Sequence, residues 1–210
     1  MNDSSQPAAA SQLGVVILGA GRSSRMGRPK LLLPWRESTV IGAILSQWRS
    51  LQPAQITMVS RPDDEAIAQE LRRLDFPIQN LIVNPHADLG MFSSIQAAAR
   101  WTGWFPGLTG CVIVLGDQPH LRTDTLHSIL LCHLQHPDAI CQPIHESRSG
   151  HPVLLPRWAV DRLKTTSLAT LKDFMNQHST TIKQCPVSDV GLTLDMDTFE
   201  DYKLLLTSHH

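Results

Sequence analysis

The chain has 210 residues, of which 42% are hydrophobic and 18% are charged, and its formal net charge is −1 with the histidines neutral. This length suits one α/β domain or two small ones, and the composition allows a sizeable core. A net charge this close to zero gives no overall field that would attract nucleic acid or an anionic membrane, so an anionic ligand would have to be held by local cations.

The N-terminal segment, residues 1–12 (MNDSSQPAAASQ), has neither the cationic start nor the apolar stretch of a secretory signal. We expect it to be a disordered lead that precedes a single domain over residues 13–206. No apolar run in the sequence approaches the roughly 18 residues of a membrane span. We therefore expect a cytoplasmic protein that has neither a membrane nor nucleic acid among its partners.

Apolar runs of strand length alternate with helical patterns along the rest of the chain. Leu13–Leu18 (LGVVIL) is an uninterrupted apolar run that ends at a glycine, which is typical of a strand buried on both faces of a parallel sheet. Helices are predicted at residues 39–50, 63–74, 91–100, 123–136, 158–163, 168–178 and 199–206, and strands at residues 13–18, 56–60, 80–83, 110–115, 139–143, 153–156 and 182–186. This alternation predicts an α/β fold, with a three-layer, mostly parallel, Rossmann-like sheet and helices on both faces.

The four cysteines are widely separated in the sequence, at Cys111, Cys132, Cys141 and Cys185. They form no C-x-x-C pair, and this spacing gives no support to a zinc site. We expect free buried thiols in a reducing cytoplasm.

The first predicted strand leads into the loop of residues 19–30 (GAGRSSRMGRPK), which holds three glycines, two serines, three arginines and a lysine. Open backbone amides and clustered cations of this kind can hold phosphate oxygens. A Walker loop is excluded because the string G-x-x-x-x-G-K-[ST] is absent. A dinucleotide fingerprint fits poorly, because Ser24 stands at its third glycine and the apolar residues 41–45 replace its acidic residue. The remaining alternatives are a polyphosphate site served by Arg25 and Lys30, or an ordinary turn with exposed basic residues.

Three aspartates are candidate metal ligands. Asp117 follows the predicted strand 110–115, so it lies at the carboxyl end of the sheet, where open α/β folds bind ligands. A carboxylate there can hold Mg²⁺, although Gly-Asp is also ordinary turn chemistry. Asp195 and Asp197 alternate in LTLDMDT and would share one face of a strand, while the alternative is that one of them only caps the helix predicted from residue 199.

A second candidate anion site lies where a helix is predicted to begin after Gly90. Ser93 and Ser94 lie in its first turns, where backbone amides favour anions and hydroxyl groups add donors. The alternative for either serine alone is an ordinary helix cap.

Taken together, these motifs resemble a known family. LGAGRSSRMGRPKLLLP is similar to the signature loop of the MobA-like NTP transferases, the nucleotidyltransferases related to molybdenum cofactor biosynthesis. Four more stretches carry the resemblance, which covers residues 13–206: NPHADLGMFSSIQAA, VLGDQPHL, SGHPVLLP and LTLDMDTFEDY. The cytidylyltransferase branch is the nearest match and the guanylyltransferase branch the next. The resemblance implies the fold of nucleotide-diphospho-sugar transferases, which is like that of the A-type glycosyltransferases.

The resemblance also implies roles for individual residues. Catalysis would depend on Arg25, Lys30 and Asp117, and Mg²⁺ would be held by Asp117 and Asp197. The second substrate would meet Gly150, His151 and Pro152. The nucleotide would be bound by Leu18, Gly19, Ala20, Gly21, Arg22, Ser23, Ser24, Arg25, Lys30, Gly90, Ser93 and Ser94.

The implied reaction is the transfer of CMP from CTP to molybdenum-bearing molybdopterin, with release of pyrophosphate. A molybdoenzyme or its chaperone is a further implied partner. The alternatives are a guanylyltransferase, a nucleotidyltransferase for another phosphorylated small molecule, and a non-catalytic nucleotide-binding partner in molybdoenzyme maturation.

One residue bears on the choice of base. Cytidylyl members resemble this chain in having alanine at the position of Ala20, where guanylyl members usually have glycine, and a methyl group there narrows the space for a purine. Two departures stand against the family pattern. The first is Gly19, which replaces the usual alanine. The second is at residues 164–175, where KTTSLATLKDFM replaces the usual Gly-Asp-x-Gly-Ala-Arg-like stretch. The second departure leaves the identity of the acceptor open.

Overall fold

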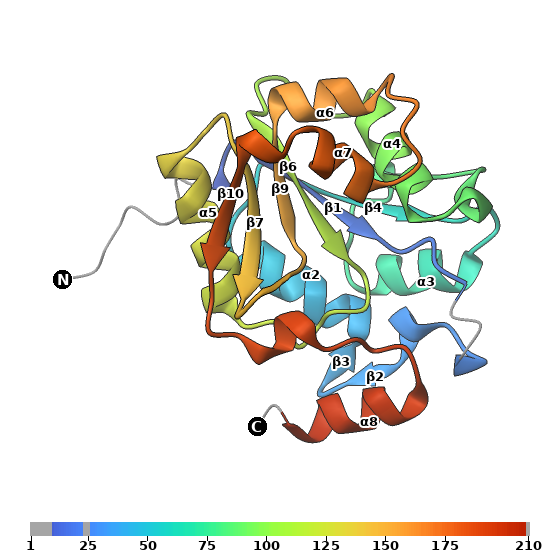
Figure 1. The fold of residues 1–210 in the computed structure, drawn as a ribbon. Coiled ribbons are helices and arrows are strands. Elements are labelled where there is room, and N and C mark those ends of the chain that lie inside the picture. Colours follow the sequence, from blue (N-terminus) through green and yellow to red (C-terminus); the bar gives the residue numbers. More distant parts are fainter. Residues whose placement is uncertain (1–9, 23–25, 209–210) are drawn as a thin grey trace.

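The computed structural model describes residues 10–22 and 26–208 of the chain (Figure 1). Residues 1–9 of the predicted lead lie outside the described residues. Ala10 is buried, and the carbonyl of Gln12 accepts a hydrogen bond from the Thr109 amide at 2.9 Å, so the end of this segment packs beside the start of β6 (Gly110–Leu115). Within the described ranges, no helix is long and apolar enough to cross a membrane.

A central sheet runs through the molecule in the strand order β10-β7-β9-β6-β1-β4-β5, with the short β8 paired to β7. The sheet is mostly parallel, as predicted, and β9 runs antiparallel to both of its neighbours. Its strands are β1 (Leu13–Leu18), β4 (Gln55–Ser60), β5 (Leu81–Val83), β6 (Gly110–Leu115), β7 (Ile140–His145), β8 (Arg148–Ser149), β9 (Val153–Pro156) and β10 (Ile182–Pro186).

Helices cover both faces of the sheet, so the predicted three-layer arrangement is confirmed (Figure 1). One face carries α4 (Met91–Arg100), α6 (Arg157–Leu163) and α7 (Leu171–Gln177), and the other carries α2 (Val40–Ser50), α3 (Glu65–Arg73) and α5 (Thr123–Gln135). The last helix, α8 (Phe199–Ser208), packs beside a small hairpin of β2 (Pro34–Trp35) and β3 (Ser38–Thr39), where the rings of Trp35 and Tyr202 lie 6.4 Å apart.

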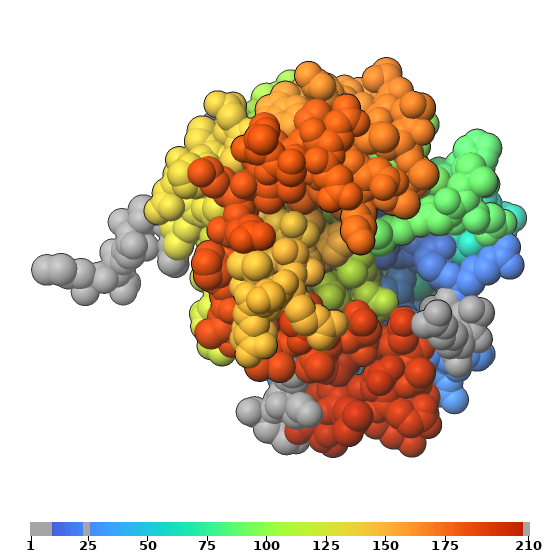
Figure 2. Space-filling model, viewed as in Figure 1, coloured from blue at the N-terminus to red at the C-terminus, as the bar shows by residue number. Residues whose placement is uncertain are grey.

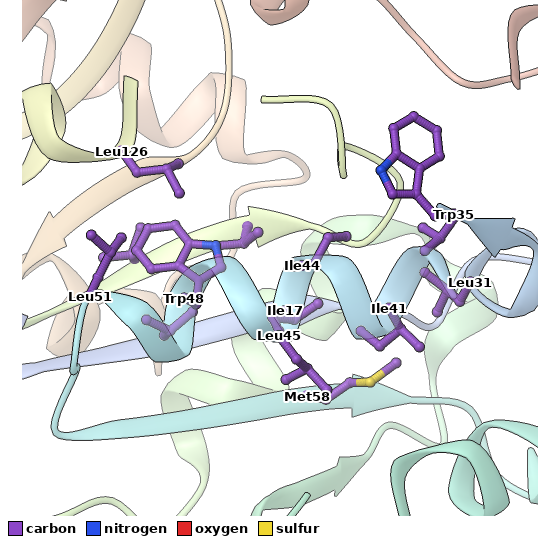
Figure 3. Close-up of a cluster of buried hydrophobic side chains, with 14 of the residues drawn as sticks. Ile17, Leu31, Trp35, Ile41, Ile44, Leu45, Trp48, Leu51, Met58 and Leu126 are labelled. Carbon is purple, nitrogen blue, oxygen red and sulfur yellow. The ribbon is translucent and has the colours of Figure 1, made fainter. Parts of the chain in front are cut away.

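Alternate residues of the central strands enter different layers of the core. In β1, Val15 and Ile17 join the apolar cluster beneath α2, whereas Val16 joins the cluster beneath α4. Figure 3 shows the first cluster, in which the apolar side of α2 lies over Ile17 of β1 and Met58 of β4. Because side chains of a strand alternate between its faces, a strand buried on both sides must be apolar throughout, as the LGVVIL run is.

Side-chain caps set helix starts that the sequence located only approximately. The Thr39 hydroxyl accepts a hydrogen bond from the Gly42 amide at 3.2 Å, and α2 begins at Val40. The Asp64 carboxylate accepts one from the Ile67 amide at 3.4 Å, so α3 begins at Glu65 rather than at residue 63.

Two features differ from the predicted elements. The β2–β3 hairpin and β8 were not predicted, because two-residue strands leave no periodic pattern. The prediction that Asp195 and Asp197 share one face of a strand is wrong. Residues 194–197 pair with no described strand and form a loop before α8. The turn η6 (Val190–Thr193) folds the chain just before these residues, so the alternation in the sequence does not continue as extended backbone.

A buried carboxylate anchors this C-terminal loop. Asp189 is 3% exposed and accepts hydrogen bonds from the amides of Arg122 and Gly191, each at 2.9 Å. It also accepts one from the Thr125 hydroxyl at 2.7 Å. These bonds join η6 to the first turn of α5, where a negative charge is also favoured by the helix dipole. They fix the direction in which the chain continues toward Asp197.

Replacing Asp189 by alanine would leave two amides and a hydroxyl without their acceptor, so we expect the free energy of unfolding to fall by about 3 kcal/mol. Urea unfolding would measure this loss. The matched control is Asp124→Ala, which removes an exposed carboxylate paired with Arg122 and should change stability by less than about 1 kcal/mol. Equal losses in the two variants would contradict an anchoring role for Asp189.

Candidate active site

A cavity of about 590 Å³ opens at the carboxyl edge of the sheet. Figure 2 shows a hollow on this face, between the red C-terminal segment and the green segment that contains α4. The cavity is lined by Leu18, Gly19, Ala20, Gly21, Arg22, Lys30, Leu31, Arg61, Ala87, Asp88, Gly90, Met91, Ser94, Leu115, Gly116, Asp117 and Asp197. Most of the predicted nucleotide and metal residues therefore meet in one place. The predicted site residues Ser23, Ser24 and Arg25 lie outside the described residues.

Strand pairing explains why residues so far apart in the sequence meet here. β1 and β6 are parallel neighbours, and Leu18 is paired with Leu115. The chain leaves both strands at the same level, where the Gly116 amide donates a hydrogen bond to the carbonyl of Leu18 at 3.1 Å. The glycine loop and Asp117 consequently begin side by side, at the edge where open α/β sheets bind ligands.

One lysine and two aspartates form an ion-pair network in the cavity. The ammonium of Lys30 lies 2.8 Å from a carboxylate oxygen of Asp197 and 3.3 Å from one of Asp117. The lysine side chain is 13% exposed, so the two carboxylates surround a cation that is largely shielded from water. Carboxylate oxygens are ligands that Mg²⁺ and Mn²⁺ prefer, and this pair already accommodates a positive charge. The residues therefore fit a hard divalent cation.

Two arginines add positive charge to the cavity lining. Arg22 and Arg61 both donate to the same oxygen of Asp88, each at 2.8 Å. These hydrogen bonds, that of Arg22 foremost, hold the pKa of the Asp88 carboxyl below its usual range. Arg61 was not predicted. It follows β4, a parallel neighbour of β1, and its place directly after a strand is the signal that would have found it.

The segment before α4 brings Gly90 and Ser94 into the cavity lining. Gly90 has φ 95° and ψ 178°, a backbone conformation that is essentially restricted to glycine. The buried amide of Asn84 donates to the hydroxyls of Ser93 and Ser94 at 2.9 and 3.0 Å. Ser93 also donates to the carbonyl of Gly90 at 2.8 Å and does not line the cavity, so Ser94 is the serine that faces it. Asn84 was not predicted to orient these serines.

The departure at Gly19 has a local explanation. A Cβ at this position would lie 2.3 Å from the Met58 methyl group and 3.2 Å from the carbonyl oxygen of Val59. The Gly19 amide donates to that same carbonyl at 2.8 Å, which holds the loop against β4. In this chain the Met58 side chain fills the space that an alanine methyl would need.

The predicted second-substrate segment does not line the cavity. Gly150, His151 and Pro152 lie just before β9, whose first residue, Val153, is paired with Ile113 of β6. Nε2 of His151 is buried without a hydrogen-bond partner, and burial lowers the pKa of this imidazole to about 4. The ring is therefore neutral at pH 7, and it can offer a hydrogen bond to an anionic group but no positive charge.

Comparison with known proteins points to one family. Residues 15–182 match the family described as MobA-like NTP transferase domain. A molybdenum cofactor cytidylyltransferase from Escherichia coli (strain K12) is 26% identical over 198 residues, which cover 91% of this chain and 94% of that protein.

Solved structures of the same fold are also similar over most of the chain. Rv0371c from Mycobacterium tuberculosis H37Rv is 30% identical with a TM-score of 0.73, and the match covers 95% of this chain and 99% of that one. Rv0371c in complex with manganese gives a TM-score of 0.71 at 30% identity, with 94% and 99% covered. A 4-diphosphocytidyl-2C-methyl-D-erythritol synthase from Anaerococcus prevotii has a TM-score of 0.72 at 12% identity, over 95% and 97% of the two chains, which is a likeness of fold alone.

The ion-pair network predicts a competition between Lys30 and a divalent ion. Because the ammonium contacts both aspartates, Lys30→Ala should bind Mn²⁺ about tenfold more tightly than the unaltered protein when no nucleotide is present. A titration that follows free Mn²⁺ by electron paramagnetic resonance would measure the affinity. Lys203→Ala, which removes an exposed ammonium on α8, is the control and should leave the affinity unchanged. Equal or weaker Mn²⁺ binding by Lys30→Ala would contradict the competition.

Proposed function

Because the chain belongs to the MobA-like NTP transferase family, we propose that this nucleotidyltransferase transfers CMP from CTP to molybdenum-bearing molybdopterin, releases pyrophosphate and depends on Mg²⁺. The observation that carries the proposal is the meeting of the glycine loop, Lys30 and two carboxylates at the ends of β1 and β6. The E. coli relative, which covers nearly the whole chain, supports the choice of CTP and of the acceptor.

In this proposal the triphosphate lies against the loop that follows β1. Backbone amides of residues 20–22 face its oxygens, and Lys30 and Arg61 neutralise its charge. Asp117 and Asp197 are the residues that would hold the divalent ion, which when bound supplies charge neutralisation and alignment of the phosphate oxygens. The base and ribose lie toward Gly90 and Ser94, on the α4 side of the cavity.

The reaction needs no nucleophile from the protein. A terminal phosphate oxygen of the acceptor attacks the α-phosphorus of the nucleotide, forming a new P–O bond. The bond from the α-phosphorus to the oxygen that bridges it to the β-phosphorus breaks, and that oxygen leaves with pyrophosphate. The protein's contribution is to align the two substrates and to stabilise the charge on the leaving group, the latter through Lys30 and Arg61.

One departure from the family pattern favours a second candidate acceptor. Residues 164–175 lack the usual glycines and arginine, and two backbone carbonyls at the start of this segment accept hydrogen bonds from α4. The carbonyl of Lys164 accepts from Arg100 at 2.7 Å, and that of Thr166 accepts from Gln96 at 2.9 Å. This segment thus has its own packing role, and a different phosphorylated small molecule is the second candidate acceptor.

Turnover should depend on Asp117 and not on the exposed Asp195. In the presence of CTP, Mg²⁺ and molybdenum-bearing molybdopterin, Asp117→Asn should release pyrophosphate at least about a hundredfold more slowly than the unaltered protein. The substitution removes a negative charge from the pair of carboxylates that would hold the divalent ion. Asp195→Asn is the matched control, since Asp195 is exposed and does not line the cavity. Release only with another phosphorylated acceptor would favour the second candidate. Nucleotide binding with no release for any acceptor would contradict catalysis.

Ala20 should set the preference for the base. We expect Ala20→Gly to shift the ratio of CTP to GTP affinity toward GTP by about tenfold, because it removes a methyl group from a confined wall of the cavity. Thermal stabilisation by each nucleotide with Mg²⁺ gives the affinities, since saturation at about a hundred times the Kd adds roughly 2.7 kcal/mol. Ala87→Gly, which removes another methyl from the same cavity, should leave the ratio unchanged. A GTP preference in the unaltered protein would overturn the choice of CTP.

A further inference from the structure

Three of the four cysteines come together on the α5 side of the sheet. Cys132 lies in α5, Cys141 in β7 and Cys185 in β10, and their sulfur atoms all lie within 4.8 Å of one another. Cys141 and Cys185 are fully buried, while Cys132 is half-buried. Their separation in the sequence hides this cluster, because a helix and two neighbouring strands bring it together.

The strand register explains the meeting. β7 and β10 are parallel, and Pro143 is paired with Cys185 while Cys141 is paired with Lys183. Cys141 and Cys185 are therefore two residues out of step along the strands and point to the same face. That face is covered by α5, and both thiols join the same apolar cluster as its Leu126, with Cys132 packed against it.

We propose that Cys132, Cys141 and Cys185 together bind one thiophilic metal ion of the zinc class. Three sulfur atoms that bind Zn²⁺ at about 2.3 Å lie about 3.8 Å apart in tetrahedral geometry. The sulfur atoms need to move inward by about 1 Å at most to reach that spacing. Water would complete the coordination from the side of Cys132, which is the least buried of the three.

Cysteine binds a metal ion as the thiolate. An ion that takes all three sulfur atoms would therefore displace protons from the thiols of the cluster.

The net charge of the site with a bound ion would also be small. Three thiolates and a divalent ion leave one net negative charge, and the Lys183 ammonium lies near enough to favour the thiolate of Cys132. None of the three cysteines lines the cavity at the carboxyl edge. The metal would tie α5 to β7 and β10, so its expected effect is on stability rather than on nucleotide transfer.

The test is a titration of the full-length protein with Co²⁺, after treatment with a chelator and in the presence of a phosphine reductant without oxygen. We expect a thiolate-to-cobalt charge-transfer absorption that saturates at one equivalent and disappears when Zn²⁺ is added. Protons should be released as the ion binds, and Zn²⁺ should raise the melting temperature. The absorption should be lost in Cys141→Ser and in Cys132→Ser. Position 132 is half-buried and therefore tolerates a hydroxyl group.

Two further variants make the result specific. Cys111→Ser should keep the absorption, because Cys111 is buried in the apolar cluster on the other face of the sheet. Asp117→Asn should also keep the absorption. This result would show that the carboxylates of the cavity do not bind the cobalt ion, whether or not the proposed reaction takes place. Cobalt binding without a thiolate band, or a band that survives in both Cys132→Ser and Cys141→Ser, would overturn the proposal.

Discussion

The meeting of the glycine loop and Asp117 depends on the parallel pairing of β1 with β6. The two strands end together at Leu18 and Leu115, so the glycine loop and Asp117 start from adjacent points. Burial on both faces fixes this register, because a slip of one residue would exchange the side chains that enter the two apolar clusters. The cohesion of the core and the geometry of the cavity therefore have the same physical origin.

Among the described residues, the charges of the cavity lining balance before any ligand arrives. Its described lining includes three cationic side chains and three carboxylates: Arg22, Arg61, Lys30, Asp88, Asp117 and Asp197. A triphosphate brings several negative charges to this neutral set, and a divalent ion would supply part of the missing positive charge. An ion that occupied the two aspartates would also compete with their ion pairs to the Lys30 ammonium. This double effect gives a physical reason for metal dependence in the proposed reaction.

Much of the fold was predictable, because its elements carry strong local patterns. The buried strands β1 and β6 are unbroken apolar runs, and both have their predicted bounds. The places of Asp117 and the glycine loop followed from the rule that parallel strands end at one edge. Applied to β4, the same rule would have located Arg61. The loop that carries Asp197 was not predictable, since Asp189 determines its path through contacts with a distant helix.

The cysteines show the limit of reasoning from spacing. A search for C-x-x-C pairs tests only ligands that one loop can supply. The thiols of Cys132, Cys141 and Cys185 meet through the order of strands in the sheet and the position of α5, which are properties of the topology. A sequence pattern therefore rules out a local metal loop, but it says nothing about ligands that are assembled by tertiary structure.

The antiparallel direction of β9 has a consequence for how the carboxyl edge is built. The chain turns back from β7 into β9 at the carboxyl edge, so this connection needs no helix to cross the sheet. Residues 146–152, with His151 among them, form this connection, and within it Arg148 and Ser149 pair back onto β7 as β8. None of these residues belongs to β1 or β6. The turn that carries His151 is thus built separately from the strands that place the glycine loop and Asp117.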